Sequence, residues 1–181
     1  MKPGKIVEKF NINGKTVIFR YPTIKDLDGL LNCINSLVEE RAMVRIQKKK
    51  TRKEEKEWLL KTLKNIKAKT EVFLVVDIEG KIMGSSGVTK NRGAMAHVGE
   101  LGISLRKEAR GKGMGKRLFK ALIREAKKVL KVKIITLEVF GRNSIAQNLY
   151  KKCGFKEMGR IKKGVNHYGR FDDLVTMVKY L

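Results

Sequence analysis

The stretch EARGKGMGKRLFKAL, residues 108–122, places three glycines among basic residues and then passes into a helical pattern. Glycine loses more conformational freedom on ordering than any other residue, so glycines this closely spaced are costly unless the backbone requires them. Leu118, Leu122 and Val129 then recur at the spacing of one helix face. The stretch therefore predicts a glycine-rich loop that opens an amphipathic helix.

Such a loop is a predicted anion-binding site. The first N–H groups of a helix have no partner within the helix, and the helix dipole adds partial positive charge there. Arg110, Lys112, Lys116 and Arg117 add full charges. Two common phosphate loops are excluded, because neither G-x-x-x-x-G-K-[ST] nor G-x-G-x-x-G aligns with these glycines. We expect a phosphate or pyrophosphate ligand of another kind.

Hydrophobic periodicity in the rest of the chain predicts a mixed α/β domain. The predicted order is β-α-α-β-β-β-α-β-α-β-β, which is not a regular doubly wound sheet. Strands are expected at 15–22, as three strands within 71–105, at 131–140, and in a terminal hairpin formed by 155–164 and 173–181. Helices are expected at 23–40, at 51–67 with Trp58, Leu59, Leu63 and Ile66 buried, after the glycine loop, and at 143–154.

One family pattern does fit the glycine loop. The form R-x-x-G-x-G matches Arg110, Gly113 and Gly115. A second pattern follows in LEVFGRNSIAQNLYKKCGF, residues 137–155, and matches at Leu137, Val139, Asn143, Ala146, Leu149, Tyr150, Gly154 and Phe155. Together these signatures resemble those of the GNAT superfamily of N-acetyltransferases, especially its small-amine, amino-acid and protein N-terminal acetylating members. The resemblance implies one α/β domain over 1–181, with a mixed, mostly antiparallel sheet, flanking helices and a central splayed strand pair.

The resemblance also implies acetyl-CoA as the acetyl donor, because in that family the loop cradles its pyrophosphate. Main-chain hydrogen bonds to the pantetheine arm are assigned to Ile103, Ser104 and Leu105. Pyrophosphate contacts are assigned to Arg110, Gly111, Lys112, Gly113, Met114, Gly115 and Lys116. Asn143 is expected to cap its helix, and in the family this residue also touches the cofactor, so both interpretations stay open. No metal site is expected.

Acetyl transfer to an amine needs a route for the amine proton, a hydrogen-bond donor for the carbonyl oxygen and a proton for the departing thiolate. The resemblance implies Tyr150 as the proton donor, since a phenol with an ordinary pKa near 10 is protonated at neutral pH. Glu138 is the first candidate base. Glu100 ranks below it, because its register is one residue out of step and such a shift reverses the face of a strand. Ordered water is a third possibility, and His97, on the same strand as Glu100, could also pass a proton.

The acceptor is expected to be a primary amine, such as an amino acid, a peptide or protein N-terminus, or another small amine. Its pocket should form between the first helices and the loop at 162–174, where Tyr168, Asp172 and Asp173 could bind an ammonium group. Residues expected from the helices are Cys33, Asn35, Glu39, Glu40 and Arg41. The alternatives are a non-catalytic acyl-CoA sensor and a basic RNA- or ribosome-associated module.

The net charge of +24 has two interpretations. One is an anionic macromolecular partner such as the ribosome or RNA, and the other is a lysine-rich surface. Aromatic residues do not interleave with the basic runs, which weakens a nucleic-acid site, and the charge repels free polyamines at long range.

Length and cysteine content add the remaining expectations. A chain of 181 residues with 42% hydrophobic content suits one domain. Cys33 and Cys153 form no ligand cluster and are expected to be reduced thiols. No signal peptide or run of about 20 apolar residues is present, so we expect a cytoplasmic protein without a membrane partner. The sequence is also compatible with a homodimer in which the final strands of two copies pair.

Overall fold

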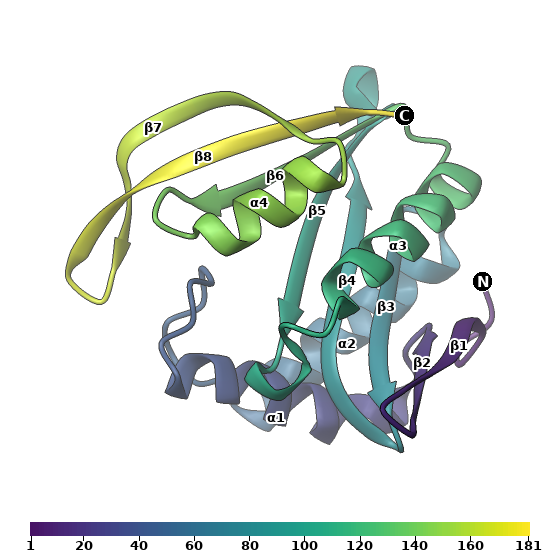
Figure 1. Ribbon diagram of the computed structural model, residues 1–181. Coiled ribbons are helices and arrows are strands. Elements are labelled where there is room, and N and C mark those ends of the chain that lie inside the picture. Colours follow the sequence, from purple (N-terminus) through teal and green to yellow (C-terminus); the bar gives the residue numbers. More distant parts are fainter.

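In the computed structural model, which describes residues 1–181, an eight-stranded sheet runs through the molecule in the order β1-β2-β3-β4-β5-β6-β8-β7 (Figure 1). Only the β5–β6 pair is parallel. The strands are β1 Ile6–Ile12, β2 Lys15–Arg20, β3 Glu71–Ile78, β4 Lys81–Lys90, β5 Val98–Leu105, β6 Ile134–Phe140, β7 Lys156–His167 and β8 Arg170–Tyr180. The predicted mixed, mostly antiparallel sheet is confirmed.

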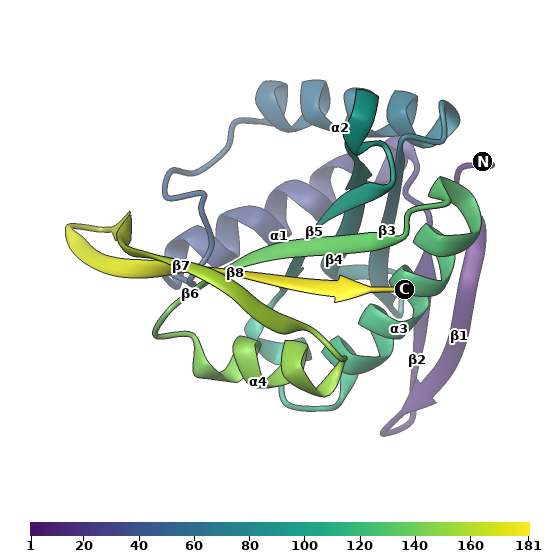
Figure 2. The ribbon, with the colours of Figure 1, turned by 90° about the horizontal axis from the view of Figure 1, so that it is seen from above.

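Helices cover both faces of the sheet, with α1 and α2 on one face and α3 and α4 on the other (Figure 2). They are α1 Leu27–Glu39, α2 Arg52–Lys67, α3 Met114–Leu130 and α4 Ser144–Lys152, with short 3-10 turns at Ile24–Asp26, Gly93–Met95 and Lys107–Ala109. None of these helices has the length and apolarity needed to cross a membrane. The sheet is therefore a platform with a separate helical layer on each side.

The core lies where β3 is covered on both faces. All but the last of its residues are buried, and the sequence EVFLVVDI is nearly continuous in apolar residues for that reason. Leu118 and Leu122 of α3 are fully buried in the same cluster of 31 buried residues. The amphipathic pattern that predicted this helix thus also fixes which side of it faces the sheet.

Two parts of the predicted element order were incomplete. β1 was missed, and it pairs antiparallel with β2 at the edge of the sheet. The expected loop at 162–174 is also wrong in form, because β7 and β8 extend through it to a tight turn at Tyr168 and Gly169. Both turn residues have positive φ, as a two-residue hairpin turn requires.

The buried side of α2 also differs from the predicted one. Trp58 is 38% exposed, and the residues that α2 buries are Glu55, Leu59, Thr62 and Ile66. The helix is therefore rotated so that a carboxylate takes a position expected for an apolar side chain.

The central strand pair separates as expected. β5 and β6 pair in register only from Val98↔Ile134 to Leu101↔Leu137, whereas β5 stays paired with β4 up to Leu105. Beyond Leu101 one edge of β5 has no strand beside it. Figure 1 shows β5 and β6 diverging beyond this point, and the residues of the candidate site lie around it.

Candidate active site

The glycine loop leads from the end of β5 into α3. Gly111 and Gly113 have φ of +77° and +72°, and Gly113 is the N-cap residue of α3. A Cβ at either position would meet nothing, so these glycines are required by backbone conformation. Gly115 has another reason, because a Cβ there would lie 3.0 Å from Leu149 of α4. The third glycine lets the start of α3 approach α4 closely.

The N–H groups of residues 111–116 donate to no acceptor within the chain. They form a continuous row of free donors at the N-terminus of a long helix, where the dipole favours negative charge. Arg110 braces this row, since its Nε donates to the carbonyl of Leu105 at 2.8 Å and its guanidinium pairs with Glu40. The loop is thus a preformed anion cradle held against β5 and the end of α1.

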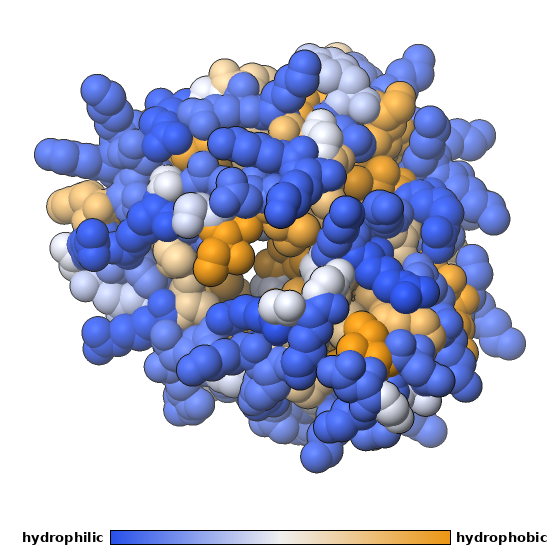
Figure 3. Space-filling view, in the orientation of Figure 1, coloured by the Kyte–Doolittle hydropathy of each residue, from blue (hydrophilic) through white to orange (hydrophobic).

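A cleft of about 1480 Å³ connects this loop with the slot between the strands. Its lining includes Leu105, Gly113, Asn143 and Tyr150 together with both candidate bases, Glu100 and Glu138. Figure 3 shows a hollow near the centre of the molecule, with apolar surface inside a hydrophilic rim. One cavity therefore brings together the expected cofactor and catalytic residues except Lys112 and Met114, which do not line it, and the Met114 side chain is buried in the core.

Tyr150 is held on the α4 side of the cleft. It is buried, and its ring lies 5.2 Å from the ring of Phe119 and 6.4 Å from that of Phe155, measured between centroids. Burial, with a smaller contribution from Cys153, raises the pKa of Tyr150 to about 12. The hydroxyl makes no hydrogen bond within the chain, so a protonated phenol faces the cleft with its proton free to donate.

Asn143 caps α4, because its side-chain oxygen accepts from the N–H of Ala146 at 3.1 Å. It also lines the cleft. Gln147 secures the same turn by donating to the carbonyls of Phe140 and Gly141. The capping interpretation of Asn143 is confirmed, and its contact with a cofactor stays a prediction.

Glu100 and Glu138 meet at one guanidinium group. Arg45 Nη2 lies 3.1 Å from Oε1 of Glu100 and 3.1 Å from Oε2 of Glu138. Glu100 does not lie on the opposite face from Glu138, as its register had predicted, because it lies beside Thr136 in the parallel pair and Glu138 is two residues further along. Both carboxylates point to the α1–α2 side of the sheet.

Comparison with known proteins places this geometry in a family. Residues 37–155 match the sequence profile of the acetyltransferase (GNAT) family. The chain belongs to the GNAT family.

Individual relatives agree with this membership. An L-amino acid N-acetyltransferase from Escherichia coli is 30% identical over 107 residues, which cover 59% of this chain and 66% of that protein. The solved structure of a ribosomal-protein-alanine N-acetyltransferase from Brucella melitensis matches with a TM-score of 0.81 and 28% identity over 90% of this chain and 99% of that one. The chain spans 66% or less of the length of each of three curated relatives.

A third solved structure, yncA of Salmonella typhimurium with its cofactor acetyl-CoA, matches over 91% of this chain and 94% of that one. Its TM-score is 0.79 and its identity is 18%, so this match supports the fold alone.

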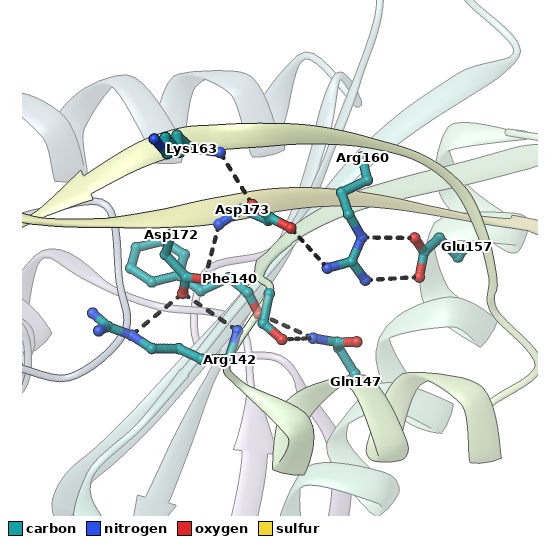
Figure 4. Close-up of polar contacts among 9 residues, drawn as sticks. Phe140, Arg142, Gln147, Glu157, Arg160, Lys163, Asp172 and Asp173 are labelled. Atoms are coloured by element: carbon teal, nitrogen blue, oxygen red, sulfur yellow. Dashed lines mark hydrogen bonds and ion pairs between the residues drawn. The ribbon is translucent and has the colours of Figure 1, made fainter.

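The terminal hairpin of this GNAT chain does not offer the free carboxylates that the sequence predicted (Figure 4). Asp172 pairs with Arg142 at 3.3 Å, and Asp173 pairs with Arg160 at 3.1 Å and accepts from the N–H of Lys163. These Asp side chains hold the hairpin to the β6–α4 turn and to itself. An ammonium site at Asp172 and Asp173 is therefore not supported by their contacts.

Tyr168 has a similar structural use. Its hydroxyl donates toward the carbonyls of Val38 and Gln47, and the guanidinium of Arg41 lies 5.1 Å from its ring centroid. The hairpin tip and the segment between α1 and α2 are thus joined across the cleft mouth. Tyr168 and Arg41 close this end of the GNAT fold against each other.

On the α1–α2 side, some of the side chains hold the structure together through hydrogen bonds or ion pairs, and others have no partner within the chain. Asn35 clamps the connecting segment by exchanging hydrogen bonds with the backbone of Lys50, at 3.0 and 2.7 Å. Burial raises the pKa of the Cys33 thiol to about 11, so this cysteine is an unreactive part of the wall. Glu39 pairs with Lys49 and does not line the cleft. Glu55 lines the cleft without an ion pair or a hydrogen bond, and no role was predicted for it from the sequence.

Proposed function

We propose that this protein transfers the acetyl group of acetyl-CoA directly to a primary amine. The observation that carries the proposal is the continuity of one cleft from the free N–H groups of residues 111–116, along the unpaired edge of β5, to Tyr150 and the Glu100–Glu138 pair. A phosphate cradle, an edge strand, an acid and two carboxylates are the groups that this reaction needs, in the order in which the substrates would meet them.

The donor would be held by the backbone more than by side chains. The N–H groups of residues 111–116 suit the pyrophosphate, with Lys112 and Lys116 adding charge. Ile103, Ser104 and Leu105 lie on the part of β5 that has no neighbour on the β6 side. The main-chain groups that face that side could bind an extended arm, apart from the Leu105 carbonyl, which accepts from Arg110. Acetyl-CoA supplies an activated thioester, and the other steps belong to residues of this chain.

Glu138 or Glu100, directly or through water, would take the proton of the acceptor ammonium group. The neutral amine nitrogen attacks the carbonyl carbon, the new C–N bond forms and the C–S bond breaks. Tyr150 gives its proton to the departing sulfur, a role that suits a phenol whose raised pKa keeps it protonated over the physiological pH range. The amide nitrogen then loses its second proton to the Tyr150 oxygen through water, and the glutamic acid returns the first proton to solvent.

The relatives do not agree on an acceptor. Their names specify an L-amino acid, spermine and the alanine of a ribosomal protein. The proposed acceptor class therefore remains the primary amine. The net charge of +24 favours acceptors presented on anionic bodies, such as nascent ribosomal proteins, over free polycations at long range.

The experiment is a panel of amines incubated with acetyl-CoA and scored by CoA release, with the product confirmed by mass. Tyr150→Phe keeps the ring packed against Phe119 and Phe155 and removes only the proton. We expect it to lower kcat by about 10²-fold or more with little change in the KM for acetyl-CoA.

Tyr180→Phe, at a tyrosine that is 73% exposed, is the matched control and should leave both constants unchanged. Unchanged turnover in Tyr150→Phe would disprove the role of Tyr150. If the protein binds acetyl-CoA tightly but no amine in the panel causes CoA to be released, the alternative of a non-catalytic acyl-CoA sensor is favoured.

A further inference from the structure

Lysines gather on the face of the molecule that α3 and α4 cover. Residues 126–156 contain eight lysines and arginines and one acidic residue, Glu138, which points to the other side of the sheet and pairs with Arg45. The acidic residue of α3, Glu125, is buried and accepts from Tyr21. Hydrophilic residues cover most of this face, which is the front in Figures 1 and 3. The exposed lysines of α3 and α4 therefore have no exposed acidic neighbour on these two helices.

Two stripes of cations run along α3, and only one of them is paired. Arg117 and Arg124 form ion pairs with Glu8 of β1. The adjacent stripe consists of Lys116, Lys120 and Lys127. None of its ammonium groups has an ion pair or a hydrogen bond within the chain, although other lysines of the chain do. Because Lys116 lines the cleft, the part of this stripe that is free for another partner begins at Lys120.

Further lysines come together where α4 ends. Burial raises the pKa of the Cys153 thiol, and the charges of Lys116, Lys179 and Lys120 act against that rise, so these lysines of α3 and β8 lie near one another. A Cβ at Gly154 would lie 2.6 Å from Nζ of Lys179, which places this ammonium group over the turn after α4. The end of α4 and the start of β7 add three exposed lysines. We define the α3–α4 lysine surface as Lys120, Lys127, Lys151, Lys152, Lys156 and Lys179.

This surface has cations but no exposed aromatic ring. The nearby aromatic residues Phe119, Tyr150 and Phe155 are buried. Tyr180 is exposed, but it follows Lys179 on β8 and so points to the opposite face of the sheet. Unpaired bases bind to proteins largely by stacking on aromatic side chains, whereas a duplex keeps its bases inside and presents phosphates. The surface therefore suits the backbone of a duplex better than a single strand.

We propose that the α3–α4 lysine surface binds the phosphate backbone of double-helical RNA. Lysine binds phosphate as a point charge, and RNA duplexes are recognised mainly through shape and backbone contacts, so no base-reading side chain is needed. The choice of RNA over DNA rests on the proposed function, which favours acceptors on nascent ribosomal proteins. A-form and B-form duplexes place their phosphates differently, so one surface can distinguish them.

A partner on this face would not block the acceptor. Glu100 and Glu138 both point to the α1–α2 side of the sheet, and Figure 2 shows that α3 and α4 lie on the other side. The RNA would therefore hold the protein from one face while the acceptor side of the cleft stays open.

The test measures the binding of an RNA duplex of about 20 base pairs by fluorescence anisotropy. The protein is saturated with acetyl-CoA, so that the cofactor competes for any binding of RNA phosphates at the glycine loop. One triple variant removes three exposed charges of the surface: Lys120→Gln, Lys127→Gln and Lys152→Gln. The control removes three exposed, unpaired lysines of α2 on the other face: Lys53→Gln, Lys56→Gln and Lys64→Gln. The two variants have the same net charge.

At about 0.15 M salt we expect the α3–α4 variant to bind the duplex about 30-fold more weakly than the wild type, and the α2 variant at most about threefold more weakly. The slope of log K against log salt should become shallower by about three in the first variant and by less than about one in the second.

Equal weakening in the two variants would overturn the proposal, because only net charge would then matter. Tighter binding of the single strand, or equally tight binding of a DNA duplex of the same sequence, would overturn it as well. Displacement of the RNA by polyglutamate at equal charge would assign the surface to an acidic protein instead. Acetylation does not enter these measurements, so the RNA surface and the proposed function can fail independently.

Discussion

One guanidinium group pairs with both candidate bases. Arg45 is 63% exposed and lies on the segment between α1 and α2, yet its Nη2 reaches Glu100 and Glu138 together. An acceptor ammonium group that approaches these carboxylates must displace it. Arg45 therefore acts as an internal competitor for the position that the proposed reaction assigns to the amine.

Arg45→Ala is expected to lower the KM for the amine acceptor about threefold, because an exposed ion pair of this kind is worth up to about 1 kcal/mol. The KM for acetyl-CoA should not change. Lys48→Ala is the control, since Lys48 is an exposed cation of the same segment without an ion pair. Steady-state kinetics with varied amine give the answer. A raised KM would instead show that Arg45 binds the acceptor, as it would bind the carboxylate of an amino acid.

Residues differ in how far their roles could be predicted. Tyr150 and Asn143 stand in a fixed pattern, so their positions in the cleft followed from the resemblance. Arg45 and Glu55 belong to neither family signature. Their surroundings are set by how the α1–α2 side packs against the sheet, which the local sequence does not show. Asp172 and Asp173 were assigned to the wrong role, since nothing local shows that Arg142 and Arg160 would neutralise them.

At the scale of elements, apolar periodicity predicted every helix and every buried strand. β1 escaped because it is an edge strand with a bulge between Ile6 and Glu8, which breaks the alternation of exposed and half-buried residues. β7 was only partly recognised for a related reason. Nearly all of its residues are exposed, so no buried face marks its length. Elements without contact with the core leave little periodic signal.

The start of α3 allows a prediction about the glycine loop. Gly113→Ala forces a residue with a Cβ into the left-handed region, at a cost of about 1–2 kcal/mol, and turns the free N–H groups away from their common direction. We expect the KM for acetyl-CoA to rise about tenfold. Gly14→Ala is matched in strain, because the φ of Gly14, +77°, is close to the +72° of Gly113 and its environment is also open, but it lies in the β1–β2 turn.

Both glycine variants should therefore lose similar stability in thermal melts, and only Gly113→Ala should lose affinity for acetyl-CoA. A Gly113→Ala enzyme with an unchanged KM would show that the loop does not position the pyrophosphate through its backbone.

The whole molecule carries 42 lysine and arginine residues against 18 aspartate and glutamate residues, so most of its cations have no anion to pair with. Several of the carboxylates are moreover engaged inside the cleft. Repulsion among the surface cations opposes the compact state, and it is screened over about 10 Å at 0.1 M salt. We expect the Tm to rise by about 3 °C or more between 20 and 300 mM NaCl, measured by calorimetry without ligands.

NaF at the same ionic strength should give the same rise if screening is the cause, whereas binding of a particular anion would distinguish the two salts. A fall in Tm with salt would mean that surface ion pairs such as Arg52–Asp28 outweigh the repulsion.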